Sequence, residues 1–476
     1  MEINSSVGNV SNLHSNHESN PGLDTGPVSK DGYKILSSLT LYVPIDIDRL
    51  LSEKPPNFRF DRDYFVYILH LIHSIPARKR DIIELNDGYT PINRKFLQKR
   101  IHGYKRYIEY LKAHGIIVEN RQYIPNKSSM GLKFSDAYNN QIVPVSIRKW
   151  TLIKNIKYLN KNYNEELTNE FNNLKKWFNP KLTVNYDKGI DFLNQLSNDE
   201  IRNGNSQDLK LRHNCRLLPF LKIKNGEHPF YVDNTGFRLH TNLTQMLSGL
   251  RKFIKYDGKI LCSIDISNSQ LYLASSLLDD EVFLKNDLID KITNPLFISD
   301  SNYPIMLVEK IKSIKNAPDV QLFKRQVSSG KFYENFGAVL VENKLIEETE
   351  ITKIRSLAKT ITFSSIYSPN TSIGYNEPMK LFKRLFPNVY EIFRIIKKGQ
   401  NNHPALSICL QRLESELVLN IICRKISNER PDIVLFTLHD SIITTEDNVE
   451  FVQSVMYNVL RERIGLVPNF KIERWV

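Results

Sequence analysis

A segment at residues 353–367 (KIRSLAKTITFSSIY) carries side chains whose types and spacing could bind a nucleotide. At intervals of four residues it places two cations, a ring and a phenol: Arg355, Lys359, Phe363 and Tyr367. On a helix of about 100° per residue, such a spacing forms one slowly winding stripe. The apolar residues at i, i+3, i+4 and i+7 predict a separate core face: Ile354, Leu357, Ala358 and Ile361. Two cations on a fixed face suit a triphosphate, and a ring beyond them suits a base.

Two further segments each carry an aspartate where a strand meets a turn. In residues 259–270 (KILCSIDISNSQ), apolar side chains such as Ile264 alternate with side chains on the opposite face, among them Asp265. This period of two predicts a β-strand that ends near Asp265. Residues 433–445 (IVLFTLHDSIITT) are two apolar runs joined at His439 and Asp440, which predicts a β-hairpin with Asp440 at its bend. An aspartate at the end of an apolar strand is costly unless it binds a cation or lies at an exposed tip.

Each of these segments also has an ordinary structural interpretation. The basic stripe could be the solvated face of an amphipathic helix, although this leaves Phe363 and Tyr367 on the non-core side unexplained. His439 alone could be a structural histidine with satisfied hydrogen bonds. The order of the three segments along the chain is more specific than any one of them.

This order resembles the family A DNA polymerases, the DNA polymerase I group. The spacing Arg-x3-Lys-x3-Phe-x3-Tyr is similar to the motif of their fingers helix. Asp265 and Ser267 match the first metal motif, Asp-x-Ser-Gln-x-Glu, and the pair His439–Asp440 resembles the second. The resemblance covers residues 236–476. It implies an α+β right-hand polymerase with an antiparallel palm sheet and helical fingers and thumb.

The resemblance implies a role for each matching position. Asp265 and Asp440 would hold two Mg²⁺ ions. Arg355 and Lys359 would bind the triphosphate, with Lys359 also protonating pyrophosphate; Phe363 would pack on the incoming nucleotide and Tyr367 would guard the template side. The resemblance also implies that five residues contact the primer–template: Arg238, Asn242, Arg251, Gln411 and His439. Gln411 would contact the minor groove.

The chain departs from the family pattern near the nucleotide sugar. Gln270 stands where a Glu usually blocks the ribose 2′-OH, and Asn268 stands where Gln is usual. Ser441 follows Asp440, as in the phage-type single-subunit RNA polymerases, where most DNA polymerases have Glu. Because Gln270 is bulky, we expect dNTPs to be preferred, with rNTP use as the alternative. In residues 329–334 (SGKFYE), Tyr333 or Glu334 stands where the fingers usually supply a His.

Residues 60–150 predict a separate small domain. Helices are expected at 64–75, 93–101 and 104–114, followed by a hairpin at 116–118 and 123–134. Three helices and a hairpin resemble a winged-helix domain, whose third helix usually enters a DNA groove. That helix would present Lys105, Arg106 and Lys112. The alternative is a helical interaction module with no DNA contact.

The remaining ranges complete the expected organisation. Residues 1–32, rich in Asn, Ser and Gly, predict a disordered arm. The basic, helical region 151–235 predicts either a thumb that holds duplex by its backbone or a linker subdomain. Palm and fingers would occupy 236–476, with an inserted subdomain over 279–320.

The overall composition indicates the kind of binding partner and the cellular compartment. The 476 residues carry 65 Lys+Arg against 52 Asp+Glu, a net charge of +13, and the pI is about 9.3. This surplus favours a nucleic acid, although an AT-rich genome that encodes Lys, Asn and Ile widely would also produce it. Four cysteines without metal-site spacing predict a reduced, cytoplasmic chain. No secretory signal or apolar run of about 20 residues points to a membrane.

The expected function is therefore a family A-type DNA polymerase that serves replication of a phage, plasmid or mobile element. No carboxylate-rich exonuclease segment is present, so we expect no proofreading. Its partners would be a DNA primer–template, dNTPs and replication accessory proteins. The alternatives are an RNA polymerase or primase that uses rNTPs on the same fold, and a non-enzymatic replication initiator that binds DNA.

Overall fold

A computed structural model describes residues 25–28, 34–79, 81–120, 130–158, 170–205, 207–281, 303–398 and 403–476. The chain divides into two compact units. The first comprises Met1–His73 and Tyr89–Asn160, and the second comprises Ser74–Gly88 and Lys161–Val476. Both mix helices with antiparallel sheets, as the predicted α+β class requires. Every helix of the described ranges is too short or too polar to cross a membrane.

The first unit contains the three helices and the hairpin predicted from the sequence. Helices α2 (Arg62–Arg78), α4 (Arg94–Arg100) and α5 (Tyr104–Ala113) precede strands β5 (Ile117–Glu119) and β6 (Gly131–Phe134). The predicted hairpin segment 121–129 lies outside the described residues. Helix α2 forms the core with side chains that are completely buried: Phe65, Val66, Ile68, Leu69 and Ile72.

Among the strands of the first unit that were not predicted, three border the predicted helices in sequence. Strand β4 (Thr90–Pro91) lies between α2 and α4 and completes a sheet of order β4-β6-β5. It is an edge strand, where a proline without an N–H is tolerated. Strands β3 (Leu39–Val43) and β7 (Val143–Ile147) pair antiparallel and enclose the helical segment in sequence. Strand β7 lies inside the predicted range 60–150, whereas its partner β3 lies on the N-terminal side of that range.

Part of the predicted disordered arm is a strand. Thr25–Val28 forms β1, which pairs antiparallel with β2 (Lys34–Leu36). Short α1 (Ile47–Glu53) follows β3 and begins with Asp46, whose side chain accepts the backbone N–H of Arg49.

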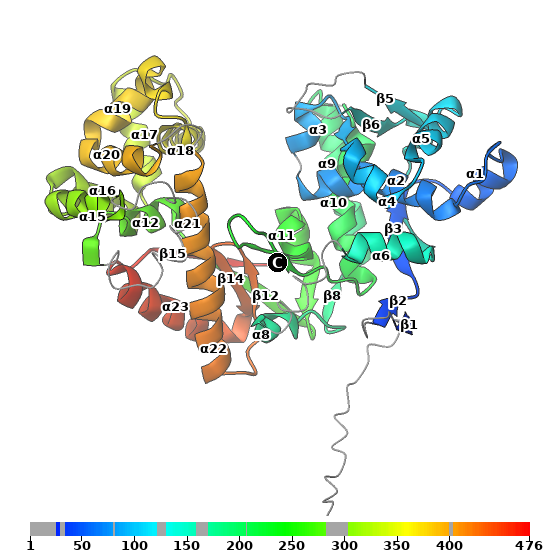
Figure 1. The fold of residues 1–476 in the computed structure, drawn as a ribbon. Coiled ribbons are helices and arrows are strands. Elements are labelled where there is room, and N and C mark those ends of the chain that lie inside the picture. The colour runs from blue at the N-terminus through cyan, green and yellow to red at the C-terminus, as the bar shows by residue number, and fades with distance from the viewer. Residues whose placement is uncertain are drawn as a thin grey trace, which may run out of the picture. The chain divides into compact units, whose positions relative to one another are not determined.

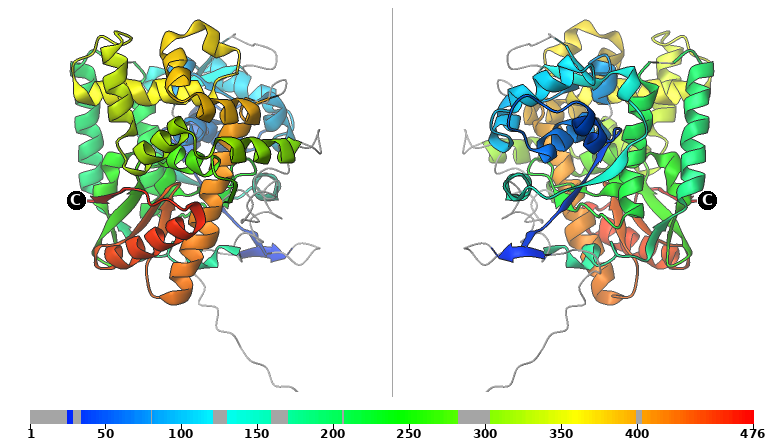
Figure 2. Two further views of the ribbon diagram at one scale, coloured as in Figure 1. Left: turned by 90° about the vertical axis from the view of Figure 1, so that its left-hand side faces the viewer. Right: turned by 90° about the vertical axis from the view of Figure 1, so that its right-hand side faces the viewer.

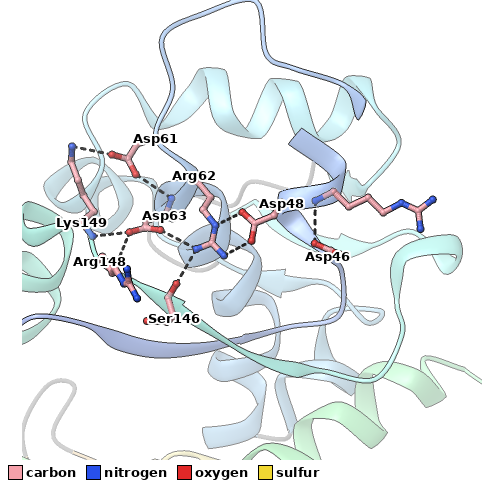
Figure 3. A network of polar contacts seen from close by, with 9 residues as sticks. Asp46, Asp48, Asp61, Arg62, Asp63, Ser146, Arg148 and Lys149 are labelled. Carbon is pink, nitrogen blue, oxygen red and sulfur yellow. Dashed lines mark hydrogen bonds and ion pairs between the residues drawn. The ribbon is translucent and has the colours of Figure 1, made fainter. Parts of the chain in front are cut away.

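A network of charged groups connects α1, α2 and the junction of β7 with α6 (Trp150–Tyr158) (Figure 3). The Arg62 guanidinium donates to both carboxylate oxygens of Asp48, at 2.5 and 2.8 Å, and to the Ser146 carbonyl at 2.9 Å. It also reaches Asp63 at 3.1 Å. Asp63 accepts the backbone N–H groups of Arg148 and Lys149, at 2.6 and 2.7 Å, just before α6 begins. It therefore satisfies donors that the end of a helix leaves free.

The second unit is built on a six-stranded antiparallel sheet. Its strands are ordered β13 (Phe436–Leu438), β14 (Ser441–Thr445), β12 (Lys259–Ile266), β11 (Ile254–Tyr256) and β8 (Leu182–Val184). Strand β15 (Phe470–Arg474) pairs with β12 on the edge that β11 leaves free. One face of β12 contributes Ile264 and Ile266 to the main hydrophobic core, together with apolar residues of α23 (Val449–Ile464).

Strand β8 corrects the prediction that residues 151–235 are helical. After α8 (Asn172–Lys175), Leu182–Val184 pairs with β11 at the edge of the sheet. Only then follow the two long helices α9 (Tyr186–Arg202) and α10 (Leu209–Lys224). Gly189 of α9 lies so close to the Phe220 ring of α10 that an added Cβ would be 2.3 Å from a ring carbon. A strand of three residues is too short for a periodic pattern to reveal.

Apart from a two-stranded sheet of β9 (Tyr231–Val232) and β10 (Leu239–His240), helices form most of the rest of the second unit (Figures 1 and 2). The segment between the two aspartate motifs contains α12 (Ser269–Ser276), α15 (Tyr303–Ile314), α16 (Pro318–Ser328), α17 (Phe332–Glu342), α18 (Ile351–Tyr367), α19 (Glu377–Leu385) and α20 (Pro387–Ile396). Residues 279–281 and 303–320 of the predicted insertion are described, and the second range contains α15 and the start of α16, which pack on α20 and join the main core. Residues 282–302 of this segment lie outside the described ranges.

One long helical column runs past the sheet (Figure 1). It consists of α21 (Ala405–Ser415), a π-helical segment (Glu416–Ile422) and α22 (Cys423–Glu429). The π-helical segment packs against α23. Such segments are rare and often occur at functional sites.

We expect Arg62→Ala to destabilise the first unit because four hydrogen bonds of a partly buried guanidinium are lost. The free energy of unfolding should fall by about 2 kcal/mol. The matched control is Arg49→Ala on α1, whose exposed pair with Glu53 should contribute within about 0.5 kcal/mol. Denaturant unfolding of both variants measures the difference, and equal losses would show that the Figure 3 network does not stabilise this unit.

Candidate functional site

The pairing of β12 with β14 brings the two predicted acids to one end of the sheet. Asp265 is directly opposite Ser441, and Asp440 immediately precedes Ser441 in the turn between β13 and β14. The intervening turn residue His439 has a φ of 58°. This left-handed conformation is uncommon for a residue with a side chain and costs on the order of 1 kcal/mol or more. The hairpin bend predicted from the sequence is confirmed, and it carries local strain.

The electrostatics of the two acids favour a cation between them. Burial and the negative charge of Asp265 raise the pKa of Asp440, while a hydrogen bond from Ser269 opposes the shift. The Ser263 hydroxyl donates to Asp265 at 3.3 Å. Within the described ranges neither acid has a Lys or Arg at ion-pair distance. Two adjacent carboxylates without a cationic side chain are unfavourable unless another positive charge is supplied.

The donor set fits Mg²⁺ better than a transition metal. In the described part of the chain, no group of three or more His, Cys, Asp or Glu side chains could hold a metal ion. Zinc sites usually need three or four such protein ligands. Mg²⁺ is commonly held by one or two carboxylates and completes its coordination with water and substrate phosphates.

Helix α18 carries the predicted stripe, and α17 supports it. Arg355 and Lys359 are exposed, while Phe363 and Tyr367 are partly buried. The Arg355 Nε donates to Glu334 at 2.7 Å, and its guanidinium lies 5.6 Å from the centre of the Tyr333 ring. The Lys359 ammonium lies 5.6 Å from the Phe363 ring. The rings follow one another with centroids 6.3 Å apart for Tyr333–Phe363 and 5.6 Å apart for Phe363–Tyr367.

The core face of α18 differs from the predicted one. Leu357 is 40% exposed, whereas the buried positions are Ala358, Thr362, Ser365 and Ile366. The hydroxyls of Thr362 and Ser365 donate to carbonyls one turn back, at 2.7 and 2.8 Å. Their polar groups are thereby satisfied inside the helix. Small side chains are needed on this face because α17 approaches closely at Gly337, where an added Cβ would be 2.7 Å from Ile354 Cγ2.

A hydrogen-bond relay joins α18 to the sheet end. The Tyr367 hydroxyl donates to Gln270 Oε1 at 3.0 Å, and Gln270 Nε2 donates to Glu414 Oε2 at 2.6 Å. Arg238 pairs with Glu414 through Nε and Nη2, both at 2.9 Å. The Glu414 side chain is only 2% exposed, and burial raises its pKa to about 7 against the opposing effect of Arg238. Sequence reasoning missed Glu414, although an acid within the apolar run of α21 was a signal for it.

Two of the residues predicted to contact nucleic acid have structural partners instead. Arg238 is committed to the buried Glu414, and its side chain is 22% exposed. Asn242 is completely buried, and its Nδ2 donates to the Glu227 carbonyl at 2.6 Å. Its side chain therefore offers no surface to a primer–template.

Of the other three predicted contacts, Arg251 and His439 lie near the acids and Gln411 lies on α21. Burial lowers the pKa of Arg251, which is close enough to Asp265 and Glu473 to feel their charge. Burial also lowers the pKa of His439 to about 4, so this ring is neutral at pH 7. Gln411 is partly buried against Gly236, where an added Cβ would be 2.5 Å from its Oε1.

The candidate DNA-contacting residues of the first unit lie on α5. Lys105, Arg106 and Lys112 are all exposed. Lys112 pairs with Glu119 at 2.6 Å, and the Arg106 guanidinium lies 5.2 Å from the Phe58 ring. Lys105 has no ion-pair partner among the described residues and is the most available of the three.

Comparison with known proteins adds little to this geometry. No family model matches the chain, and no curated protein matches it. Among solved structures, it is similar to one described as the POL domain of Pol1 from M. smegmatis in complex with DNA primer-template and dNTP. The identity is 12% and the TM-score 0.30, over 60% of this chain and 56% of that chain. A match at this level does not decide fold or function.

We expect Gly337→Ala to push α18 away from α17. Helix propensity alone would make this change stabilising by about 1 kcal/mol, whereas the close contact with Ile354 should lower the free energy of unfolding by about 1–3 kcal/mol. Gly374→Ala is the control, because nothing lies within 4 Å of its added Cβ. Denaturant unfolding measures the sign of the change in the free energy of unfolding. Stabilisation by Gly337→Ala would contradict the tight packing of α17 on α18.

Proposed function

We propose that this chain is a template-directed nucleotidyltransferase, a DNA polymerase of family A type that extends a primer with dNTPs. The observation that carries the proposal is the pairing of β12 with β14, which brings Asp265 and Asp440 together. The relay from Tyr367 to Gln270 supports it, because it ties the cationic helix α18 to the strand–helix segment that carries Asp265.

Phosphoryl transfer from a triphosphate requires positioning and charge stabilisation more than covalent help from the protein. In this proposal Asp265 and Asp440 hold two Mg²⁺ ions, which when bound stabilise the charge that develops on the transferring phosphoryl group. Arg355 and Lys359 bind the triphosphate, and Lys359 holds the proton that the pyrophosphate oxygen receives. Phe363 packs against the incoming nucleotide, and Tyr367 closes the stripe beside Gln270.

The first unit supplies DNA binding in this proposal. Its order of α2, β4, α4, α5, β5 and β6 is that of a winged-helix-like domain, in which α5 would enter a groove. The net charge of +13 supports a nucleic-acid partner. Helices α9 and α10 would act as a thumb. We further propose that the chain lacks a proofreading exonuclease and serves, in the cytoplasm, replication of a phage, plasmid or mobile element with accessory proteins.

A second candidate function is synthesis of RNA or primers from rNTPs at the same site. Ser441 favours it, because this small, buried residue is opposite Asp265 where most DNA polymerases have Glu. Comparing incorporation of labelled dNTPs and rNTPs on primed and unprimed single strands distinguishes the two functions.

We expect Asp265→Asn and Asp440→Asn each to reduce primer extension with Mg²⁺ and dNTPs by at least about 100-fold. The control is Asp447→Asn, an exposed acid paired with Lys259 at the opposite end of β12, which should retain full activity. Undiminished extension by Asp440→Asn would remove the proposal. A chain that shifts duplex DNA yet never incorporates a nucleotide would instead be a DNA-binding initiator.

We expect Lys105→Ala to weaken duplex binding by the full-length chain and to lower the slope of log K against log salt by about 1, because one phosphate contact is lost. Arg49→Ala removes the same charge from α1 and should leave the slope unchanged. Fluorescence anisotropy across a salt series measures both variants. Equal slopes would mean that α5 does not contact DNA.

A further inference from the structure

Glu414 lies behind the position at which nucleotide sugars would be selected. The resemblance places the sugar-blocking side chain at Gln270, which is partly exposed, while Glu414 is buried beneath it. The two side chains come from positions 144 residues apart and meet at 2.6 Å. Glu414 is too buried to touch a substrate itself, so any effect on selection must act through Gln270.

The chemistry of the carboxylate fixes the direction of the whole relay. Both Glu414 oxygens accept hydrogen bonds from Arg238, and an accepting oxygen is met by the NH₂ group of Gln270 rather than by its carbonyl. The amide oxygen of Gln270 then faces the Tyr367 hydroxyl and accepts from it at 3.0 Å. Both ends of the Gln270 amide are occupied. A side chain held at both ends cannot rotate away from a nucleotide without breaking two hydrogen bonds.

The carboxylate of Glu414 is itself held in place. Arg238 binds both of its oxygens at 2.9 Å, which opposes the rise in the pKa of Glu414 that burial causes and fixes the plane of the carboxylate. The turn before Arg238 is fastened to α21 by two more bonds. Arg412 donates to the Thr235 carbonyl at 2.7 Å, and Ser415 donates to the Gly236 carbonyl at 2.9 Å. These contacts make the support under Gln270 rigid.

We propose that Glu414 is a specificity-determining positioning residue, which holds Gln270 against Tyr367 so that nucleotides with a ribose 2′-OH are excluded. The inference rests on the proposed polymerase function. It assigns to a buried acid on α21 the control of a side chain on α12. Selectivity for deoxyribose then depends on the rigidity of Gln270 as well as on its size.

The test is the ratio of kcat/KM for a dNTP to kcat/KM for the matching rNTP in primer extension by the full chain. Glu414→Ala should lower this ratio by about 10- to 100-fold, because Gln270 becomes free to move. Glu429→Ala, an exposed acid on α22, is the control and should leave the ratio unchanged. A merely structural role would lower both kcat/KM values equally, so the ratio separates the two roles. Glu414→Gln keeps the side-chain volume and replaces the alanine variant if that variant does not fold.

A double-mutant cycle tests the contact directly. Gln270→Glu alone sets two carboxylates at the 2.6 Å contact and should lower the ratio. Gln270→Glu with Glu414→Gln exchanges the amide and the acid, and should recover part of the lost selectivity. Additive effects of the two substitutions would overturn the inference.

The outcomes also separate this inference from the function on which it rests. If the unmodified chain incorporates neither nucleotide, the polymerase proposal fails and the inference falls with it. If the chain extends primers and Glu414→Ala leaves the ratio unchanged, only the inference is overturned. Equal use of rNTPs and dNTPs by the unmodified chain overturns it as well.

Discussion

The candidate site depends on the register in which β12 and β14 pair. This register sets Asp265 opposite Ser441 and leaves Asp440 at the bend beside it. Because side chains alternate along a strand, a slip of one residue would turn Asp265 into the core and turn Ile264 and Ile266 out of it. The same register forces His439 into a left-handed conformation and brings two negative charges together. The positive φ of His439 and the proximity of the two carboxylates are both locally unfavourable, and such conflicts are typical of functional sites.

Helix α18 is positioned by small residues where it packs on α17 and by a hydrogen bond at its C-terminal end. Gly337 and Ala358 let α17 and α18 approach closely, since larger side chains would collide. Tyr367 then anchors the C-terminal end of α18 to Gln270. In the proposed polymerase, these two contacts would orient the stripe from Arg355 to Tyr367 toward the substrate.

Sequence patterns revealed what is local and missed what is distant. The alternation along β12, the turn at Asp440 and the four-residue spacing along α18 each depend on a few neighbouring residues. All three were predicted from the sequence. Arg238 and Gln270 lie 176 and 144 positions from Glu414, so no local pattern shows that Glu414 is their common partner. The contact predicted for Asn242 failed for the same reason, because its burial depends on segments that pack against it. Strands of two or three residues, such as β4 and β8, are too short to show a period.

The two cations of α18 differ in what they must give up to bind a phosphate. Arg355 is already paired with Glu334, whereas Lys359 has no acidic partner among the described residues. The Arg355–Glu334 pair is 45% and 40% exposed, and pairs of this kind contribute about 0–1 kcal/mol. A triphosphate carries several charges and can displace the single carboxylate at little cost. In the proposed reaction, Glu334 would hold Arg355 in place before the substrate arrives, and Lys359, without an acidic partner in the described ranges, would be the group that exchanges a proton.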